Sequence, residues 1–466
     1  MFDRQGHRGC QKPTNLKGFV FILSGVRRLE LIYNMEKIIV NGGRPLYGSV
    51  EIDGMKNAAL PIIFATLLVR GKCQIKNLPA VSDITRSLEI IENLGASVKR
   101  LNSSTVEIDT IGIHVRSVPA ELSRKMRASY YLVGAELGRF GRALVGYPGG
   151  CDFGVRPIDQ HIKGFEKLGA KVNVEGGYID ASAPNGLIGG NIFFDIVTVG
   201  ATVNVMLAAA LAEGTTIIEN AAREPHIVDL ANFLNTCGAD VKGAGTDTIK
   251  IRGVSELHGC TYAIIPDMIE AGTYMTAVAA TGGDVEICNV IPKHMESVTA
   301  KLEEMGVTVI ENDDSIRIIR DPDIALRSCN IKTLPYPGFP TDMQPQFGAL
   351  LCQADGVGMI NEGVWDNRFK YIDELRRMGA QVEVTGKTAV IRGTPAKLTA
   401  ASVRAVDLRG GAAMVVAALS VNGTTDIDDI HLIERGYDNI VGKLSALGAR
   451  IRKVYVASPD AYQEAN

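Results

Sequence analysis

The sequence is poor in aromatic side chains, which make up 6% of its 466 residues, and it contains a single tryptophan. It has no apolar run approaching the roughly 20 residues that a membrane-spanning helix needs, so no membrane partner is expected. The formal net charge of −3 offers no general attraction to nucleic acid or to an anionic membrane surface. Any binding site for an anion must therefore be built locally, from arginine and lysine side chains that the fold brings together.

Regularly spaced cysteines are missing as well. The eight cysteines include no CxxC pair, and the seven histidines include no HExxH arrangement. Neither a zinc site nor a disulfide framework is indicated. A reducing, cytoplasmic compartment is the simplest interpretation of this cysteine usage.

The first 34 residues differ from the rest of the chain. Residues 18–26 are mildly apolar, but Arg27 and Arg28 follow them, which reverses the charge order of a signal peptide. Residues 35–40 then have the composition of a β-strand that opens with methionine. We interpret residues 1–34 as a disordered leader or an over-extended start of the reading frame, and residues 456–466 as a tail.

Glycine is abundant, with 50 residues, and some of these glycines follow a repeat. Six times, an amphipathic helical pattern ends in a glycine and leads directly into a β-prone run, at intervals of roughly 70 residues. These glycines are Gly95, Gly169, Gly238, Gly306, Gly379 and Gly448. Because glycine can adopt a positive φ and end a helix, the recurrence has a mechanical cause. The pattern predicts an α/β protein of six repeated strand-helix-strand units, either as one open array or as two groups of three.

Cys151 follows Gly149 and Gly150 in a segment typical of a loop that presents a side chain at its tip. Arg156, shortly after it, supplies a fixed positive charge that favours a thiolate and suits an anionic substrate. A structural cysteine in a glycine turn fits the same segment, so both interpretations stay open.

Several basic residues fall in loops or at the ends of predicted elements, where functional groups concentrate. Lys56 stands at the start of an apolar helix, where free N–H groups and the helix dipole favour an anion. The arginines in comparable places are Arg127, Arg156, Arg368, Arg409 and Arg435. Each alone is compatible with an ordinary surface charge, but together they could hold a small polyanion.

Asp342 lies in a loop rich in proline and glycine, residues 337–344. A carboxylate held in a rigid loop suits a general base. The same position also suits the N-cap of a helix, so two roles are compatible with the local sequence.

Taken together, these segments resemble the UDP-N-acetylglucosamine 1-carboxyvinyltransferases of the enolpyruvyl transferase family, over residues 35–455. The segments that carry the resemblance are 55–61, 126–129, 148–161, 219–225, 339–344, 367–369 and 407–409. The resemblance implies a two-domain inside-out α/β barrel fold with three units per domain and an active site between the domains. The first domain would be residues 56–265, and the second would combine residues 35–55 with 266–455.

The resemblance also implies a reaction. The enolpyruvyl group of phosphoenolpyruvate moves to the 3-hydroxyl of UDP-N-acetylglucosamine, and phosphate is released, in the step that opens peptidoglycan synthesis. No metal ion and no organic cofactor is expected. Cys151 would be the general acid, the site of a covalent adduct with phosphoenolpyruvate and the target of fosfomycin, and Asp342 would accept the hydroxyl proton.

By the same resemblance, the binding residues form two sets. Those expected to bind phosphoenolpyruvate are Lys56, Asn57, Arg156, Arg368, Arg409 and Arg435, of which Lys56 and Arg435 are also expected to take part in catalysis. Those expected to hold the UDP-sugar are Arg127, Arg156, Pro157, Ile158, Asp159, Gln160, Thr198, Val199, Asp342 and Val364.

Three positions depart from the family pattern. Ile196 stands where lysine is common next to the nucleotide, Met268 where arginine is common, and Tyr131 where tryptophan is common. The loss of positive charge leaves an alternative open, in which the chain is an enolpyruvyl transferase that acts on a different nucleotide or acceptor.

A catalytically silent repeat scaffold, which binds a UDP-sugar as a regulator, is an alternative of a different class. Such a scaffold has no need for Lys56, Cys151, Asp342 and Arg409 together, and the sequence retains all four. An active enzyme is therefore the favoured hypothesis.

Overall fold

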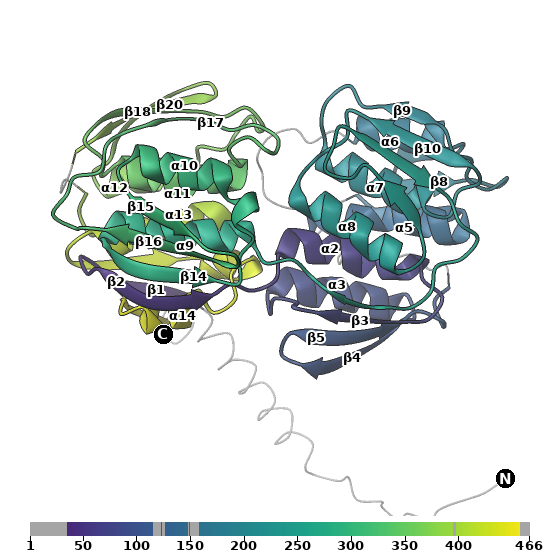
Figure 1. Ribbon diagram of the computed structural model, residues 1–466, viewed down its shortest axis with the longest axis horizontal. Coiled ribbons are helices and arrows are strands. Elements are labelled where there is room, and N and C mark those ends of the chain that lie inside the picture. The colour runs from purple at the N-terminus through teal and green to yellow at the C-terminus, as the bar shows by residue number, and fades with distance from the viewer. Residues whose placement is uncertain are drawn as a thin grey trace, which may run out of the picture.

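Two lobes make up the described part of the chain (Figure 1). The structure is a computed structural model and describes residues 35–114, 123, 126–147, 149, 158–394 and 398–456. Three of the predicted site residues, Cys151, Arg156 and Pro157, lie outside these ranges.

The first lobe contains three sheets in its described ranges, with strand orders β13–β3–β5–β4, β6–β8–β7 and β11–β12–β10–β9. The strands are β3 (Lys72–Lys76), β4 (Ser97–Asn102), β5 (Thr105–Asp109), β6 (Arg142–Gly146), β7 (Lys171–Glu175), β8 (Tyr178–Ser182), β9 (Asn191–Phe193), β10 (Thr215–Glu219), β11 (Asp240–Lys242), β12 (Thr248–Arg252) and β13 (Thr261–Ala263). The helices are α2 (Lys56–Ala65), η1 (Thr66–Leu68), α3 (Ser82–Asn93), η2 (Arg127–Tyr130), α5 (Tyr131–Phe140), α6 (Asp159–Lys167), α7 (Val199–Ala209) and α8 (Pro225–Thr236).

The second lobe likewise has three sheets among the described residues, ordered β15–β16–β14–β2, β17–β18–β20–β19 and β21–β22–β1–β23. Its strands are β1 (Met35–Asn41), β2 (Leu46–Glu51), β14 (Gly283–Cys288), β15 (Thr308–Glu311), β16 (Ser315–Arg320), β17 (Asn330–Lys332), β18 (Gly356–Asn361), β19 (Gln381–Thr385), β20 (Thr388–Gly393), β21 (Ser402–Arg404), β22 (Thr424–Asp428) and β23 (Arg450–Val456). Its helices are α9 (Met268–Thr281), η3 (Pro292–His294), α10 (Glu296–Glu304), η4 (Thr341–Met343), α11 (Gln344–Leu351), α12 (Ile372–Arg377), α13 (Leu408–Ser420), η5 (Ile430–Arg435) and α14 (Ile440–Ala446).

The sheets repeat one connection. A strand leads through an outer helix to a hairpin whose second strand returns beside the first, as in β14, α10, β15 and β16. In the sixth unit this returning strand is β1, which lies between β22 and β23 and pairs antiparallel with both. The α/β class and the repeated units are therefore confirmed, and the units form two groups rather than one open array. β23 includes Val456, so it extends by one residue into the segment expected as a tail.

The six repeat glycines end the outer helices as predicted. Each has a positive φ, between 88° and 104°, which side chains other than glycine rarely adopt. At Gly169 and Gly448, an added Cβ would meet no atom within 4 Å, so the backbone conformation alone selects glycine there. The prediction of a glycine that stops each helix is confirmed.

The core of each lobe consists of inner helices, with the sheets outside them. In the first lobe α5 packs on α2 and α7, and in the second lobe α9, α11 and α13 pack on one another. α9 is buried along its entire length, whereas an outer helix such as α3 buries only one side. Close helix contact requires small residues: a Cβ on Gly134 of α5 would lie 2.3 Å from the carbonyl oxygen of Asn204 in α7.

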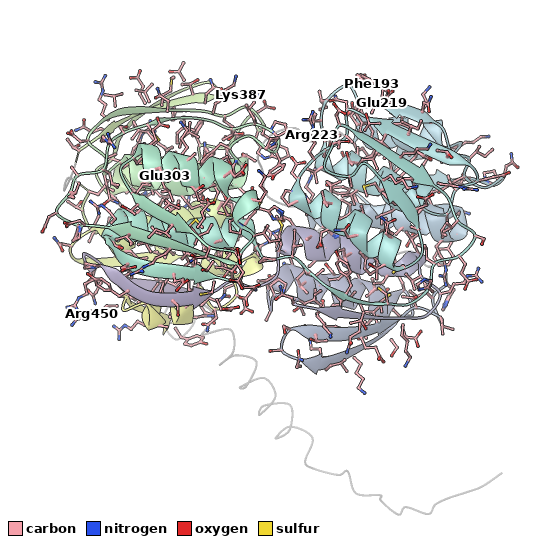
Figure 2. All side chains as sticks on the ribbon, viewed as in Figure 1. Phe193, Glu219, Arg223, Glu303, Lys387 and Arg450 are labelled. Atoms are coloured by element: carbon pink, nitrogen blue, oxygen red, sulfur yellow. The ribbon has the colours of Figure 1, made fainter. Side chains whose placement is uncertain are left out.

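Charged side chains cover the outside of both lobes, with Glu303, Lys387 and Arg450 as exposed examples (Figure 2). No helix among the described residues is both long and apolar enough to span a lipid bilayer.

The chain crosses between the lobes near Gly54 and Pro266, and the two crossings lie side by side. Met55 N–H donates to the Ile265 carbonyl at 2.7 Å, and Asp267 N–H donates to the Asp53 carbonyl at 2.8 Å. A Cβ at Gly54 would lie 1.6 Å from the carbonyl oxygen of Asn77, so only glycine permits this approach. The two lobes are thus joined by a short hydrogen-bonded pair of strands rather than by two separate linkers.

Candidate active site

A cavity of about 610 Å³ lies between the lobes, within the volume range of small-molecule sites. The predicted residues of the first lobe that line it are Lys56, Asn57, Arg127, Asp159, Gln160, Thr198 and Val199, and those of the second lobe are Asp342, Val364, Arg368, Arg409 and Arg435. Residues that are far apart in the sequence therefore meet at one place.

The inner helices explain this convergence, because they begin at the cavity. The first turns of α2, α7, α9 and α13 line it directly, and α5 and α11 are preceded there by η2 and η4. The N-terminus of a helix carries partial positive charge and free N–H groups, which favour anions. Backbone N–H groups at these helix starts therefore add to the lysine and arginine side chains that can hold an anion. Carboxylates line the same cavity, namely Asp83, Asp159, Glu224, Asp342, Asp366 and Asp407.

Asp342 lies at the centre of the arginine cluster in the second lobe. Its Oδ1 accepts a hydrogen bond from Arg368 Nη2 at 3.0 Å, and its Oδ2 accepts from Arg409 Nε and Nη2, both at 3.2 Å. The N-cap of α11 is Met343, so Asp342 does not cap this helix. Burial alone would raise the pKa of Asp342, but Arg409 and Arg368 outweigh it and hold the pKa well below its ordinary value. Asp342 is therefore a carboxylate shared between two arginines.

Lys56 opens α2 and is buried, with 8% of its surface exposed, rather than solvated at the surface. Burial lowers the pKa of its ammonium group; Asp83 opposes this effect, and Arg409 and Arg435 add to it. Lys56 Nζ lies 3.4 Å from Asp83 Oδ2, and Arg435 Nε donates to Asp83 Oδ1 at 3.1 Å. Asp83 on α3 thus bridges a lysine of its own lobe and an arginine of the other.

Asp83 is a site residue that the sequence did not indicate. An acidic residue in the first turn of a helix is ordinary, because it offsets the helix dipole, and nothing nearby distinguishes Asp83 from that case. His226, buried in the cavity wall, was not predicted either, and burial lowers its pKa to about 4, which keeps the ring neutral at pH 7.

Replacing Asp83 with asparagine should lower the free energy of unfolding at pH 7 by about 3 kcal/mol, because two buried cations lose their carboxylate. Burial would raise the pKa of Asp83, but Lys56 and Arg435 hold it below its ordinary value. The stabilisation that the Asp83 carboxylate gives the folded state is therefore complete above about pH 4, the pKa of an aspartate in the unfolded chain. It is lost as the pH falls through the lower pKa of the folded state. Denaturant titrations between pH 3 and 7 measure it, with the exposed Asp373→Asn as control. If Asp83→Asn lowered the free energy of unfolding by the same amount at every pH, the charge pairing of Asp83 with Lys56 and Arg435 would be contradicted.

The opposite side of the cavity is less charged. Gln160 Oε1 accepts from Asp195 N–H at 3.0 Å, and Gln160 Nε2 donates to the Asp195 carboxylate at 3.0 Å. The guanidinium of Arg127 lies 5.4 Å from the ring centre of Tyr130. A Cβ at Gly200 would lie 2.5 Å from the Tyr130 hydroxyl, so glycine in the first turn of α7 lets the two elements meet.

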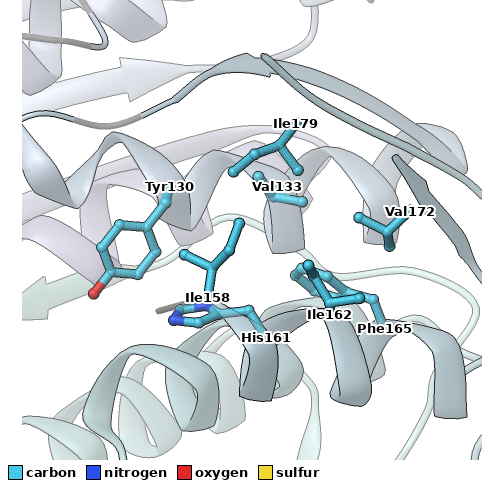
Figure 3. A pocket seen from close by; sticks show the side chains of 8 residues that line it. All are labelled: Tyr130, Val133, Ile158, His161, Ile162, Phe165, Val172 and Ile179. Carbon is cyan, nitrogen blue, oxygen red and sulfur yellow. The ribbon is translucent and has the colours of Figure 1, made fainter. Parts of the chain in front are cut away.

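Ile158, predicted among the UDP-sugar residues, lines a separate apolar pocket with Tyr130, Val133 and His161 (Figure 3). Its volume of about 10 Å³ is at most that of one water molecule. His161 Nδ1 lies 3.0 Å from Asn204 Nδ2, and burial lowers the pKa of His161 to about 3. This pocket supports the wall of the large cavity and is not a second binding site.

The three positions that depart from the family pattern all line the large cavity. Ile196 is 58% exposed there, whereas Met268 and Tyr131 are each 7% exposed. An apolar side chain at Ile196 leaves this part of the wall without the charge of a lysine.

Two lobes of repeated α/β units with a basic cluster in the cavity between them are the arrangement of an enolpyruvyl transferase. The family described as EPSP synthase (3-phosphoshikimate 1-carboxyvinyltransferase) matches residues 40–444. The chain belongs to this family.

Two curated relatives are more than half identical to the chain. It is 56% identical to the UDP-N-acetylglucosamine 1-carboxyvinyltransferase of Clostridium botulinum, over 90% of this chain and 99% of the relative. It is 55% identical to UDP-N-acetylglucosamine 1-carboxyvinyltransferase 3 of Caldanaerobacter subterraneus, over 90% of this chain and 100% of the relative.

Among solved structures, the enolpyruvyl transferase NikO from Streptomyces tendae is similar, with a TM-score of 0.82 and 25% identity, over 91% of this chain and 99% of that one. EPSP synthase from Acinetobacter baumannii shares the fold, with a TM-score of 0.70 and 18% identity, over 90% of this chain and 100% of that one.

Proposed function

We propose that the chain transfers the enolpyruvyl group of phosphoenolpyruvate to the 3-hydroxyl of UDP-N-acetylglucosamine, with release of phosphate, in peptidoglycan synthesis. The observation that carries this proposal is the cluster of Lys56, Arg368, Arg409 and Arg435 in a cavity between lobes. Asp83 pairs with Lys56 and Arg435, and Asp342 pairs with Arg368 and Arg409, so two carboxylates hold the four cations in place. A substrate that carries both a phosphate and a carboxylate suits such a cluster, since guanidinium groups bind both in pairs of hydrogen bonds.

The reaction needs a base for the acceptor hydroxyl and an acid for the methylene carbon. We assign the base to Asp342, whose arginines would be shared with the incoming anion. Because those arginines hold its pKa low, engaging them with substrate raises the pKa and makes the carboxylate a better proton acceptor. Cys151 is assigned as the acid that protonates the methylene carbon, and loss of phosphate with a proton then leaves the enolpyruvyl ether.

The less charged side of the cavity would hold the UDP-sugar. Arg127 and the first turn of α7, with Thr198 and Val199, would contact the diphosphate, because a helix N-terminus and a guanidinium both favour phosphate. Asp159, Gln160 and Val364 would contact the nucleoside and the sugar.

We extend the proposal to the organisation of the chain. Residues 56–265 would form one domain, and residues 35–55 with 266–455 the other. In support, every named strand in the described ranges pairs within its own lobe. Closure of the two domains would exclude water from the cavity and strengthen its charge contacts. A cytoplasmic location is part of the proposal.

The experiment that tests the activity is a phosphate-release assay with four mixtures. Phosphoenolpyruvate and UDP-N-acetylglucosamine together should release phosphate, and either substrate alone should not. The fourth mixture replaces the UDP-sugar with 3-phosphoshikimate, the acceptor in the family's description. Release with that acceptor, but none with UDP-N-acetylglucosamine, would overturn the substrate assignment.

A further inference from the structure

Three cysteines of the first lobe converge outside the cavity. Within the described residues, the sulfur atoms of Cys73, Cys237 and Cys260 all lie within 4.8 Å of one another, and Cys237 Sγ lies 3.4 Å from Cys260 Sγ. Cys73 belongs to β3, Cys237 is the C-cap residue of α8, and Cys260 immediately precedes β13. None of the three lines the cavity between the lobes.

Backbone hydrogen bonds fix the positions of these three segments. β13 pairs parallel with β3, and Gln74 N–H donates to the Cys260 carbonyl at 2.8 Å. His258 N–H donates to the Cys237 carbonyl at 2.9 Å. The three thiols are therefore held together by the sheet and by the end of α8, and their convergence does not depend on flexible side chains alone.

We propose that Cys73, Cys237 and Cys260 form a binding site for a thiophilic divalent cation of the Zn²⁺ type, held by three thiolates. A Zn–S bond of about 2.3 Å places the sulfurs of a tetrahedral site about 3.8 Å apart. One pair of sulfurs is 3.4 Å apart and no pair is more than 4.8 Å apart, which is close enough to that value for small side-chain rotations to suffice. The proposal concerns a site separate from the proposed reaction.

The site is accessible from solvent. Cys73 and Cys237 are fully buried, whereas Cys260 is half-buried and gives the cation a route from solvent. The exposed ring of His258 lies against Gly238, the residue after Cys237: a Cβ there would be 3.1 Å from His258 Nε2. His258 Nδ1 lies 3.1 Å from the Gly259 carbonyl, and its ring is not among the ligand atoms that lie within 4.8 Å of one another. His258 could therefore serve as a fourth ligand through Nε2 only after its exposed ring turns toward the sulfurs, and water would otherwise take the fourth position.

A cation here would stabilise the first lobe. β13 is the last strand before the chain crosses to the second lobe near Pro266, and it is held by pairing over only three residues. Metal bonds would link Cys260, next to β13, to Cys73 in β3 and to Cys237 at the end of α8, and would thereby hold β13 in its place in the sheet. The sequence did not indicate the site, because cysteine spacing detects ligands on one local segment and these come from three.

The test uses the full chain with Cys151→Ala, so that the loop thiol contributes no metal binding. After reduction, the protein should bind one Zn²⁺ per chain, and Co²⁺ should give thiolate charge-transfer absorption of a tetrahedral site. Saturating Zn²⁺ should raise the Tm by on the order of 5 °C. Cys260→Ser, a change at the half-buried ligand, should weaken Co²⁺ binding at least about 10-fold and abolish the Tm shift.

Cys288→Ser, a half-buried cysteine of the second lobe, is the matched control and should behave as the parent protein. Circular dichroism verifies that both variants fold. Absence of the charge-transfer band in the parent, or an unchanged band in Cys260→Ser, would overturn the proposal. A second result would also overturn the proposal: peroxide, a two-electron oxidant, links Cys237 and Cys260 in a disulfide, and the same protein takes up no metal after that disulfide is reduced.

Discussion

Replacing Asp342 with asparagine should lower kcat of the phosphate-releasing reaction by about 10²- to 10⁴-fold, the range typical of a lost general base. The KM for phosphoenolpyruvate should fall rather than rise. Arg368 and Arg409 both donate to the Asp342 carboxylate, so an incoming anion competes with it, and the neutral amide removes this competitor. Steady-state kinetics with varied phosphoenolpyruvate measure the two parameters separately.

The pH dependence of the wild-type enzyme offers a second measurement of Asp342. Because its arginines hold the pKa of this carboxyl well below the ordinary value, the free enzyme keeps it ionised at neutral pH. The profile of kcat/KM, which reports the free enzyme, should therefore show no Asp342 titration above about pH 5.

Asp366→Asn is the matched control for this prediction. Asp366 lines the same cavity, but it is exposed and paired with Lys387, so its neutralisation should change kcat by less than about 3-fold. A raised KM in Asp342→Asn, or a kcat reduced by less than about 10-fold, would remove Asp342 from its assigned role.

Replacing Arg409 with methionine should lower kcat/KM for phosphoenolpyruvate by about 10³-fold. Arg409 is 2% exposed, contacts Asp342 through two nitrogens and lies 5.3 Å from the ring centre of Tyr437. Because the site around Arg409 is buried, water cannot fully take over its interaction with a bound anion once the guanidinium is removed. Since Arg409 is the foremost cation holding the pKa of Asp342 down, the acid limb of the pH profile should also move to higher pH.

Arg409→Lys separates charge from shape at this position. A lysine keeps the positive charge but cannot form the paired hydrogen bonds, so its kcat/KM should lie between those of wild type and Arg409→Met. Arg376→Met, at an exposed arginine of α12 that pairs with Asp373, should leave the kinetics unchanged. Equal losses in kcat/KM for both substrates would indicate general structural damage instead of a lost anion contact.

The repeat was predictable from the sequence because its cause is local. A helix that must turn sharply into a strand needs a positive φ, and glycine provides it at Gly95, Gly169 and the four equivalent positions. The basic residues were ambiguous one by one, because each is compatible with an exposed surface charge. Their convergence on one cavity distinguishes them, and that convergence follows from packing.

Contacts between distant segments could not be predicted in the same way. Asp83 meets Arg435 because α3 packs against η5 across the two lobes, and neither segment indicates the other. The spacing of the cysteines indicated no zinc site, and spacing does not register thiols that three separate elements bring together. Ile158 was expected at the sugar; its side chain faces the small apolar pocket beside His161, and the sugar contact itself stays a prediction.

The position of β1 has a consequence for how the protein is made. β1 precedes every other strand among the described residues, yet its two partners, β22 and β23, are the last two of those strands, as the purple and yellow segments in Figure 1 show. At about 5–20 residues per second, β1 leaves the ribosome on the order of 20–80 s before β23 is synthesised. The first lobe needs none of these strands and can complete its core during that interval, whereas the second lobe cannot complete its sheet around β1 until β23 has been synthesised.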